Sequence, residues 1–150
     1  MISLGIESTA HTFGVGIIDD KKNVLANVKD LYTTKKGGLI PVKLGEHHLE
    51  VCDNILKQAL EKANLGIKDI DVISFSISPG LGPALRVGAV AARTLALKHK
   101  KPLVGVNHAI AHQEIGRMLS GFKDPILIYA SGANTQVIAY DGGKYRVFGE

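Results

Sequence analysis

The sequence predicts an α/β protein in which a mixed five-stranded sheet is followed by a second, smaller group of strands. Short apolar runs of strand length alternate with longer segments of helical periodicity, which is typical of β-α-β units. The order strand, small polar loop, strand, polar turn, strand also occurs twice, once near each end of the chain. With 150 residues, of which 45% are hydrophobic, the chain is long enough to bury a core of ordinary size.

The first three predicted strands form an antiparallel group at the start of the chain. Residues 2–6 are a short apolar run bounded by polar residues, which indicates a buried strand. Residues 13–18 and 24–28 flank a polar turn, so they predict a β-hairpin with a longer loop. Residues 35–41 contain two adjacent glycines and are predicted to form a loop.

Three predicted helices then alternate with two further strands. The apolar residues between 46 and 63 recur at the spacing of one helical face. The next elements are a strand, a tight loop, a helix, a strand and a helix, at residues 72–78, 79–83, 84–99, 103–106 and 108–119. Three antiparallel strands extended by β-α-β crossovers give a mixed five-stranded sheet. This is the ribonuclease H-like arrangement from which each lobe of the actin-like (ASKHA) fold is built.

Three more strands close the chain, at residues 126–130, 135–140 and 145–148. The closing segment LIYASGANTQVIAYDGGKYRVFGE repeats the order of the opening LGIESTAHTFGVGIIDDKKNVLANV. A duplicated two-lobed fold would show such a repeat, although hairpin proteins also produce one by chance. We therefore predict an N-terminal lobe at residues 1–123 and the opening strands of an incomplete second lobe at 124–150. The rest of that lobe would then belong to a longer chain or to a separate polypeptide.

The composition disfavours several classes of protein. No apolar run reaches the length of a membrane span, and the N-terminus lacks the pattern of a signal peptide, so we expect a cytoplasmic protein. The single cysteine, Cys52, excludes an intramolecular disulfide and a zinc site of several cysteines, and its place on an apolar helix face predicts a core residue. The net charge of +4 suits a polyanion, but no Arg-rich run or RNA-binding motif accompanies it.

Two histidines, His108 and His112, form the strongest candidate site. On a helix they lie one turn apart on the same face, close enough to bind one metal ion, and they follow a predicted strand whose end is a common ligand position. A pair at this spacing also arises by chance, and one member could simply cap the helix. A zincin protease needs a glutamate directly after the first histidine, but Ala109 occupies that position. A peptide-hydrolysing zincin is therefore disfavoured.

The segment LIYASGANT predicts a strand, a glycine-containing loop and the next strand. Backbone N–H groups of Ser131, Gly132 and Ala133 could bind a phosphate there, with Tyr129 pointing from the strand end into the same cleft. An ordinary hairpin turn is the alternative. Residues 7–11 form the equivalent loop of the first lobe and could face the same nucleotide. The glycine-rich loop at 79–83 lacks the Walker lysine and a full dinucleotide fingerprint, so a packing role is favoured for it.

Three segments together resemble one family, the universal tRNA threonylcarbamoyl transferases. SISPGLGPALRVGAVAARTLAL, PLVGVNHAIAH and LIYASGANTQVI have the order and spacing found in bacterial TsaD and in the catalytic subunit of the KEOPS complex, and the resemblance covers residues 5–150. It implies transfer of an L-threonylcarbamoyl group from threonylcarbamoyl-AMP to the N6 amine of the adenosine beside the anticodon. The acceptors would be tRNAs that read codons beginning with A.

The resemblance also implies roles for particular residues. His108 and His112 would bind one metal ion, iron or zinc, with Tyr129 as a third ligand or near-ligand. The nucleotide and threonylcarbamoyl site would be lined by Tyr129, Ala130, Ser131, Gly132 and Ala133. The family has glycine where this chain has Ala133 and serine where it has Ala84, and alanine at 133 would weaken nucleotide binding if the loop needs positive φ. The family's second lobe supplies an aspartate ligand and the adenosine pocket, so we expect this chain alone to be inactive.

The implied partners are tRNA, the complementary C-terminal half and other KEOPS subunits. A small dimerising subunit would dock on the N-terminal helices near residues 46–63, and a kinase-like subunit would join the complex. Two other functions stay open: a non-catalytic actin-like scaffold subunit, against which the retained histidines argue, and an actin-like-fold small-molecule kinase, in which the histidine pair has no evident task. The family was once described as a glycoprotease, but the sequence offers no catalytic base for peptide hydrolysis, so this function is the least favoured.

Overall fold

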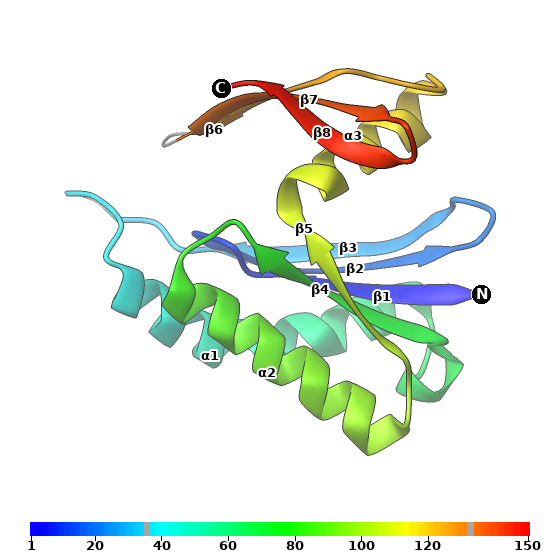
Figure 1. The fold of residues 1–150 in the computed structure, drawn as a ribbon. Helices are drawn as coiled ribbons and strands as arrows, with labels where there is room; N and C mark the ends of the chain where they lie inside the picture. The colour runs from blue at the N-terminus through cyan, green and yellow to red at the C-terminus, as the bar shows by residue number, and fades with distance from the viewer. Residues whose placement is uncertain (35–36, 132–133) are drawn as a thin grey trace. The chain divides into compact units, whose positions relative to one another are not determined.

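The computed structural model describes residues 1–34, 37–131 and 134–150. The chain divides into two compact units, which we call unit 1 (Met1–Val106) and unit 2 (Asn107–Glu150). Each unit contains one sheet (Figure 1). The predicted lobe boundary at residue 123 lies further along the chain, after the last helix, and it stays a prediction about the complete fold.

The sheet of unit 1 is the predicted mixed five-stranded sheet. Its strands have the spatial order β3-β2-β1-β4-β5. Strand β1 pairs with β2 in antiparallel and with β4 in parallel orientation, and β2 pairs with β3 in antiparallel orientation. The strands run over Ile2–Glu7 (β1), Thr12–Asp19 (β2), Val24–Leu31 (β3), Val72–Ser78 (β4) and Leu103–Asn107 (β5). The antiparallel hairpin and the crossover to β4 are therefore confirmed.

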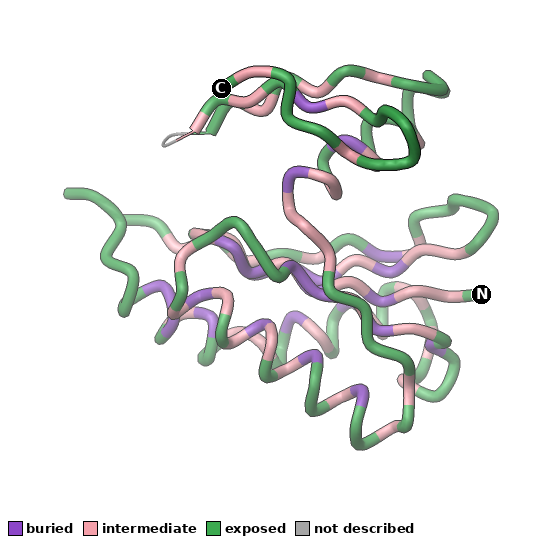
Figure 2. Tube along the Cα trace, viewed as in Figure 1, coloured by how far each residue is buried: buried purple, intermediate pink, exposed green. Residues whose placement is uncertain are grey.

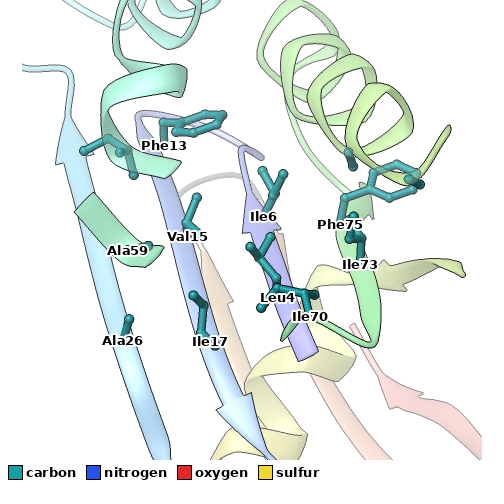
Figure 3. Packing of buried hydrophobic residues seen from close by; sticks show 13 residues of the cluster. Leu4, Ile6, Phe13, Val15, Ile17, Ala26, Ala59, Ile70, Ile73 and Phe75 are labelled. Carbon is teal, nitrogen blue, oxygen red and sulfur yellow. The ribbon is translucent and has the colours of Figure 1, made fainter. Parts of the chain in front are cut away.

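Two helices, α1 (Pro41–Ala63) and α2 (Gly82–His99), pack side by side on one face of this sheet (Figure 1). Alternate residues of the strands point toward them, because successive side chains of a strand face opposite ways. The buried residues in Figure 2 gather in the layer between the sheet and the helices. Figure 3 shows this core, to which the strands contribute Leu4, Ile6, Phe13, Val15, Ile17, Ala26, Ile73 and Phe75. Cys52 packs partly buried at its margin, as predicted.

The predicted start of α1 near residue 46 was wrong, because the helix begins at Pro41. Proline is favoured at the first helical position, where its missing N–H would have no partner in the helix anyway. Leu44 and His48 are four residues apart and both fully buried, so they extend the packed face of the helix toward its start. Gly45 lies against Pro83 of α2, and a β-carbon there would be 3.2 Å from the proline Cβ. The helix continues through Gly45 because the neighbouring Leu44 and His48 are buried and the glycine itself lies against Pro83.

Unit 2 consists of helix α3 (His108–Ser120) and the strands β6 (Leu127–Ser131), β7 (Asn134–Asp141) and β8 (Lys144–Gly149). The strands form an antiparallel sheet in the order β6-β7-β8. Strands β1, β2 and β3 pair in the same way, and both groups have a register shift between their second and third strands. The strand order that the sequence repeats at the two ends of the chain therefore forms the same antiparallel pairing twice, in β1-β2-β3 and in β6-β7-β8.

None of the helices in the described part of the chain is both long enough and apolar enough to span a bilayer.

Candidate functional site

The candidate metal site begins where β5 ends and α3 starts. Asn107 is the N-cap of α3, and its Oδ1 accepts hydrogen bonds from the backbone N–H groups of Ala109 (2.9 Å) and Ile110 (3.3 Å). This cap satisfies two N–H groups that the first helical turn leaves unpaired. His108 is consequently the first residue of the helix, and His112 follows one turn later on the same face.

The two imidazoles converge. The Nε2 atoms of His108 and His112 are 3.1 Å apart, and the ring centroids are 4.5 Å apart with an edge-to-face arrangement. Two histidine nitrogens bound at about 2.0–2.1 Å to one tetrahedral or octahedral ion would be separated by about 3 Å. The positions of these nitrogen atoms therefore fit a shared metal ion.

Tyr129 faces the same point from β6. Along this strand Leu127 and Tyr129 are half-buried whereas Ile128 is exposed, which is the alternation expected of a strand with one covered face. The Tyr129 ring centroid is 6.1 Å from that of His108 and 6.0 Å from that of His112. The structure thus brings the three predicted ligands together within unit 2, and their role as ligands stays a prediction.

Within residues 1–34, 37–131 and 134–150, no group of three or more His, Cys, Asp or Glu side chains gathers in a metal-binding arrangement. The predicted ligands in unit 2 are two imidazoles and one phenol. Structural zinc sites usually have four ligands, and catalytic sites have three protein ligands with an open position. The three predicted ligands match the catalytic number, and a further acidic ligand would bring the total to four.

The predicted nucleotide-binding residues lie next to Tyr129. Ala130 and Ser131 end β6, are exposed, and pair in register with Thr135 and Asn134 of β7. Gly132 and Ala133, from which backbone N–H groups were expected to bind phosphate, lie outside the described residues. A phosphate site at this turn therefore stays a prediction.

Sequence reasoning missed a second group of polar contacts between α3 and the rest of unit 2. The Tyr145 hydroxyl donates to Glu114 Oε1, and Glu114 Oε2 pairs with Arg117 at 2.5 Å. Burial, the hydrogen bond to Glu114 and the charge of that carboxylate together raise the pKa of Tyr145 to about 12. The Gln113 Nε2 group donates to the carbonyl of Pro125 at 2.8 Å. A sequence pattern could not have revealed the contacts of Glu114 with Tyr145 and of Gln113 with Pro125, because each joins α3 to a distant segment of the chain.

The loop between β1 and β2 directs its polar groups inward. Glu7 accepts hydrogen bonds from the backbone and hydroxyl of Thr9 and from the hydroxyl of Ser76. Gly80 packs directly on this loop, since a β-carbon there would be 2.6 Å from the Thr9 carbonyl oxygen. Leu81 N donates to the same oxygen at 2.7 Å. These contacts support the packing role that was favoured for the glycine-rich loop at 79–83.

Comparison with known proteins identifies the family. Residues 22–150 match the family described as TsaD, tRNA N6-adenosine threonylcarbamoyltransferase. The chain belongs to the TsaD family. It is 59% identical over 150 residues to the tRNA N6-adenosine threonylcarbamoyltransferase of Thermococcus sibiricus, covering all of this chain and 46% of that protein. It is 52% identical to a probable bifunctional tRNA threonylcarbamoyladenosine biosynthesis protein of Thermoplasma acidophilum, covering 28% of its length. The chain thus spans about half the length of its first curated TsaD-family relatives, or less.

Solved structures support the actin-like fold. YeaZ from Pseudomonas aeruginosa superposes with a TM-score of 0.67 at 15% identity, over 99% of this chain and 64% of that one. A ROK family glucokinase from Streptomyces griseus gives a TM-score of 0.58 at 14% identity, over the whole chain and 49% of the glucokinase. At these identities the likeness concerns the fold alone, and it bears out the predicted actin-like class for this TsaD-family chain.

Proposed function

We propose that this chain is the N-terminal part of a tRNA N6-adenosine threonylcarbamoyltransferase. The observation that carries the proposal is the convergence of His108, His112 and Tyr129 in a chain that belongs to the TsaD family. The donor would be threonylcarbamoyl-AMP. The acceptor would be the N6 amine of the adenosine beside the anticodon, in tRNAs that read codons beginning with A.

The proposed reaction is an acyl transfer. The N6 nitrogen attacks the carbamoyl carbon of the donor, a C–N bond forms, and the bond from that carbon to the phosphate oxygen breaks. AMP leaves with the bonding electron pair, and the amine loses one proton. A metal ion held by His108, His112 and Tyr129, either iron or zinc, would act as a Lewis acid that polarises the carbamoyl oxygen.

Each site residue has a task in this proposal. His108 and His112 would hold the ion through their imidazoles, and the Asn107 cap fixes the start of the helix that carries them. Tyr129 adds an oxygen donor and leads into the turn where the donor phosphate would bind. The lining of the nucleotide and threonylcarbamoyl site would be Tyr129, Ala130, Ser131, Gly132 and Ala133.

We expect the 150-residue chain alone to be inactive. It covers 46% of the first relatives, and the described residues hold no group of three or more His, Cys, Asp or Glu side chains that could bind a metal ion. A complementary C-terminal half would supply an acidic ligand and the adenosine pocket. Activity from the 150-residue chain by itself would contradict this expectation.

The decisive experiment joins the chain to its complementary half and measures threonylcarbamoylation of tRNA with threonylcarbamoyl-AMP supplied. Metal analysis of the same protein should find about one ion per chain, which His108→Ala or His112→Ala removes together with activity. His99→Ala, a histidine at the end of α2, is the matched control and should change neither. Equal metal content in all four proteins would refute the metal assignment. Metal binding without transfer to tRNA would favour a scaffold or a kinase instead.

Partner docking is proposed for the α1–α2 face of unit 1. A groove of about 370 Å³ lies between the two helices, and Leu49 and Val90 on its lining are 67% and 56% exposed. Exposed apolar side chains around a groove are typical of a protein interface. We propose that this face binds the small dimerising subunit of a KEOPS-type complex, which also contains a kinase-like subunit, in the cytoplasm. Leu49→Asp should abolish that binding, whereas Leu97→Asp, on an 80% exposed residue outside the groove lining, should not.

A further inference from the structure

Helix α3 crosses one face of the three-stranded sheet in unit 2. Tyr129 on β6 pairs with Gln136 of β7, and Tyr145 on β8 pairs with Tyr140 of β7. Positions 136 and 140 are an even number of residues apart, so the two tyrosines that oppose them lie on the same face of the sheet. The helix contacts both: its histidines meet Tyr129, and Glu114 accepts a hydrogen bond from Tyr145.

The two contacts lie far apart on that face. Tyr129 and Tyr145 are separated by two strand spacings, about 10 Å, and by four residues along the strands, about 14 Å. On the same helix, Gln113 is 3% exposed and its Nε2 donates to the Pro125 carbonyl just before β6. The helix is therefore tied to the sheet at two diagonally opposite points and, through a buried amide, to the segment that precedes β6.

Apolar packing does little to fix this helix. The buried apolar residues among the described part of unit 2 are Ala109 and Ile138, and alanine has a small contact surface. A rotation of α3 by about 20° would move an atom on its side-chain surface by roughly 2 Å. Functional groups need to be held within about 0.5 Å, so the polar contacts must supply the missing precision.

We propose that Glu114, held by Tyr145, and Gln113 are positioning residues that fix the rotation of α3 and so aim His108 and His112 at Tyr129. This inference rests on the proposed metal site. It assigns the alignment of the metal ligands to Glu114, Tyr145 and Gln113, none of which is itself a proposed ligand. Arg117 strengthens the arrangement, because its contact with Oε2 of Glu114 leaves Oε1 facing the Tyr145 hydroxyl.

The metal-free chain tests the positioning by itself. With selectively labelled histidine and tyrosine, NMR should detect nuclear Overhauser contacts between the His112 and Tyr129 rings. Tyr145→Phe removes only the hydroxyl, and we expect it to weaken or abolish these contacts while the amide spectrum of unit 1 is unchanged. Tyr140→Phe is the matched control, since the Tyr140 ring meets that of Tyr145 edge-to-face with centroids 5.0 Å apart, and it should leave the His112–Tyr129 contacts intact.

Cobalt(II) titration tests the consequence for the site. We expect Tyr145→Phe and Glu114→Ala each to weaken Co²⁺ binding about tenfold, a typical effect of removing a supporting group behind metal ligands. The double variant should be no weaker than either single variant, because both act through one hydrogen bond. If Tyr145→Phe unfolds unit 2, Gln113→Met tests the same idea, since it keeps the side-chain volume and removes the hydrogen bond to Pro125.

The outcomes separate the two proposals. Unchanged ring contacts and unchanged Co²⁺ affinity in Tyr145→Phe, Glu114→Ala and Gln113→Met would overturn the positioning role. Additive losses in the double variant would also overturn it, because they would mean that the residues act independently. Wild-type protein that binds no Co²⁺, yet shows ring contacts that depend on Tyr145, would overturn the metal assignment and leave the positioning role supported.

Discussion

The two units position their elements by different means. Unit 1 encloses a cluster of buried apolar residues between a five-stranded sheet and two helices (Figure 3), whereas the buried apolar residues among the described part of unit 2 are Ala109 and Ile138. In unit 1 the burial of large side chains fixes the packing. In unit 2 the helix is held by hydrogen bonds and ring contacts. The candidate site lies in the unit whose geometry depends most on individual polar residues.

Several large apolar side chains of unit 2 remain exposed. Unit 2 presents Phe122, Ile128 and Phe148 with 62–72% of their surface exposed. The burial of a large apolar side chain contributes about 1.5–3 kcal/mol, so these residues add little to the stability of unit 2. Substitutions in the two units should therefore have very different consequences.

The largest difference is expected between two phenylalanines. Phe13 is 1% exposed in the core of unit 1, and Phe13→Ala should lower the free energy of unfolding by about 3–5 kcal/mol, because the change leaves a cavity. Phe148→Ala, at a 62% exposed position, should change it by less than about 0.5 kcal/mol. Native-state hydrogen exchange can measure both, because it resolves the stability of β2 and β8 separately. Similar losses would contradict the assignment of the main core to unit 1.

Two helical glycines give the next largest contrast. A β-carbon on Gly88 of α2 would lie 2.9 Å from Ser8 Cβ and would collide with the Ser8 hydroxyl, so Gly88→Ala should cost about 1–3 kcal/mol. Gly116 of α3 has open space at the same position, and Gly116→Ala should stabilise the protein by up to about 1 kcal/mol through helix propensity. Chemical denaturation followed by circular dichroism tests the pair. Destabilisation by Gly116→Ala would mean that α3 is packed more closely than its contacts indicate.

The sequence was sufficient for the order of the α-helices and strands in both units. Alternating apolar runs marked the strands, and the 3.6-residue period marked α1, because each pattern follows directly from which face is buried. The start of α1 was missed because Gly45 is a weak helix former in isolation, and its contact with Pro83 is a tertiary feature that the sequence pattern does not show.

The part of the candidate site that lies on one helix could be predicted from residue spacing. His108 and His112 are neighbours because helical geometry makes them so, and the family resemblance added Tyr129. Glu114, Tyr145 and Gln113 were not predictable, since their contacts depend on how α3 crosses the sheet. Local periodicity carries no information about that crossing.

A smaller effect is expected from the buried histidine of unit 1. Desolvation and the neighbouring His47 lower the pKa of His48 below its ordinary value of 6.5. His48 is fully buried, and its Nε2 atom has no hydrogen-bond partner among the described residues. Below pH 6.5 the unfolded chain therefore binds this proton more readily than the folded one, so stability should fall as the pH is lowered. The slope for one proton is at most about 1.4 kcal/mol per pH unit.

Denaturation at a series of pH values tests this expectation. Asp30 Oδ1 lies 2.8 Å from His47 Nε2, and the Nδ1 atoms of His47 and His48 are 3.2 Å apart. We expect both contacts to persist at neutral pH. His48→Gln removes the titrating group and should flatten the slope below pH 6.5. An identical slope in wild type and His48→Gln would show that another group carries the acid sensitivity.

The last effect concerns the phenol that holds α3, and it acts only at alkaline pH. Because burial and Glu114 raise the pKa of Tyr145 from 10.0 to about 12, the folded state favours the neutral hydroxyl that donates to the carboxylate. The corresponding stability is fully present below pH 10 and is lost as the pH rises through 12. Ultraviolet titration of tyrosinate should show one late-ionising phenol that is missing in Tyr145→Phe. Glu114→Ala should lower its pKa only part of the way, since burial is the larger cause, and a complete return to 10 would mean that the hydrogen bond alone holds the proton.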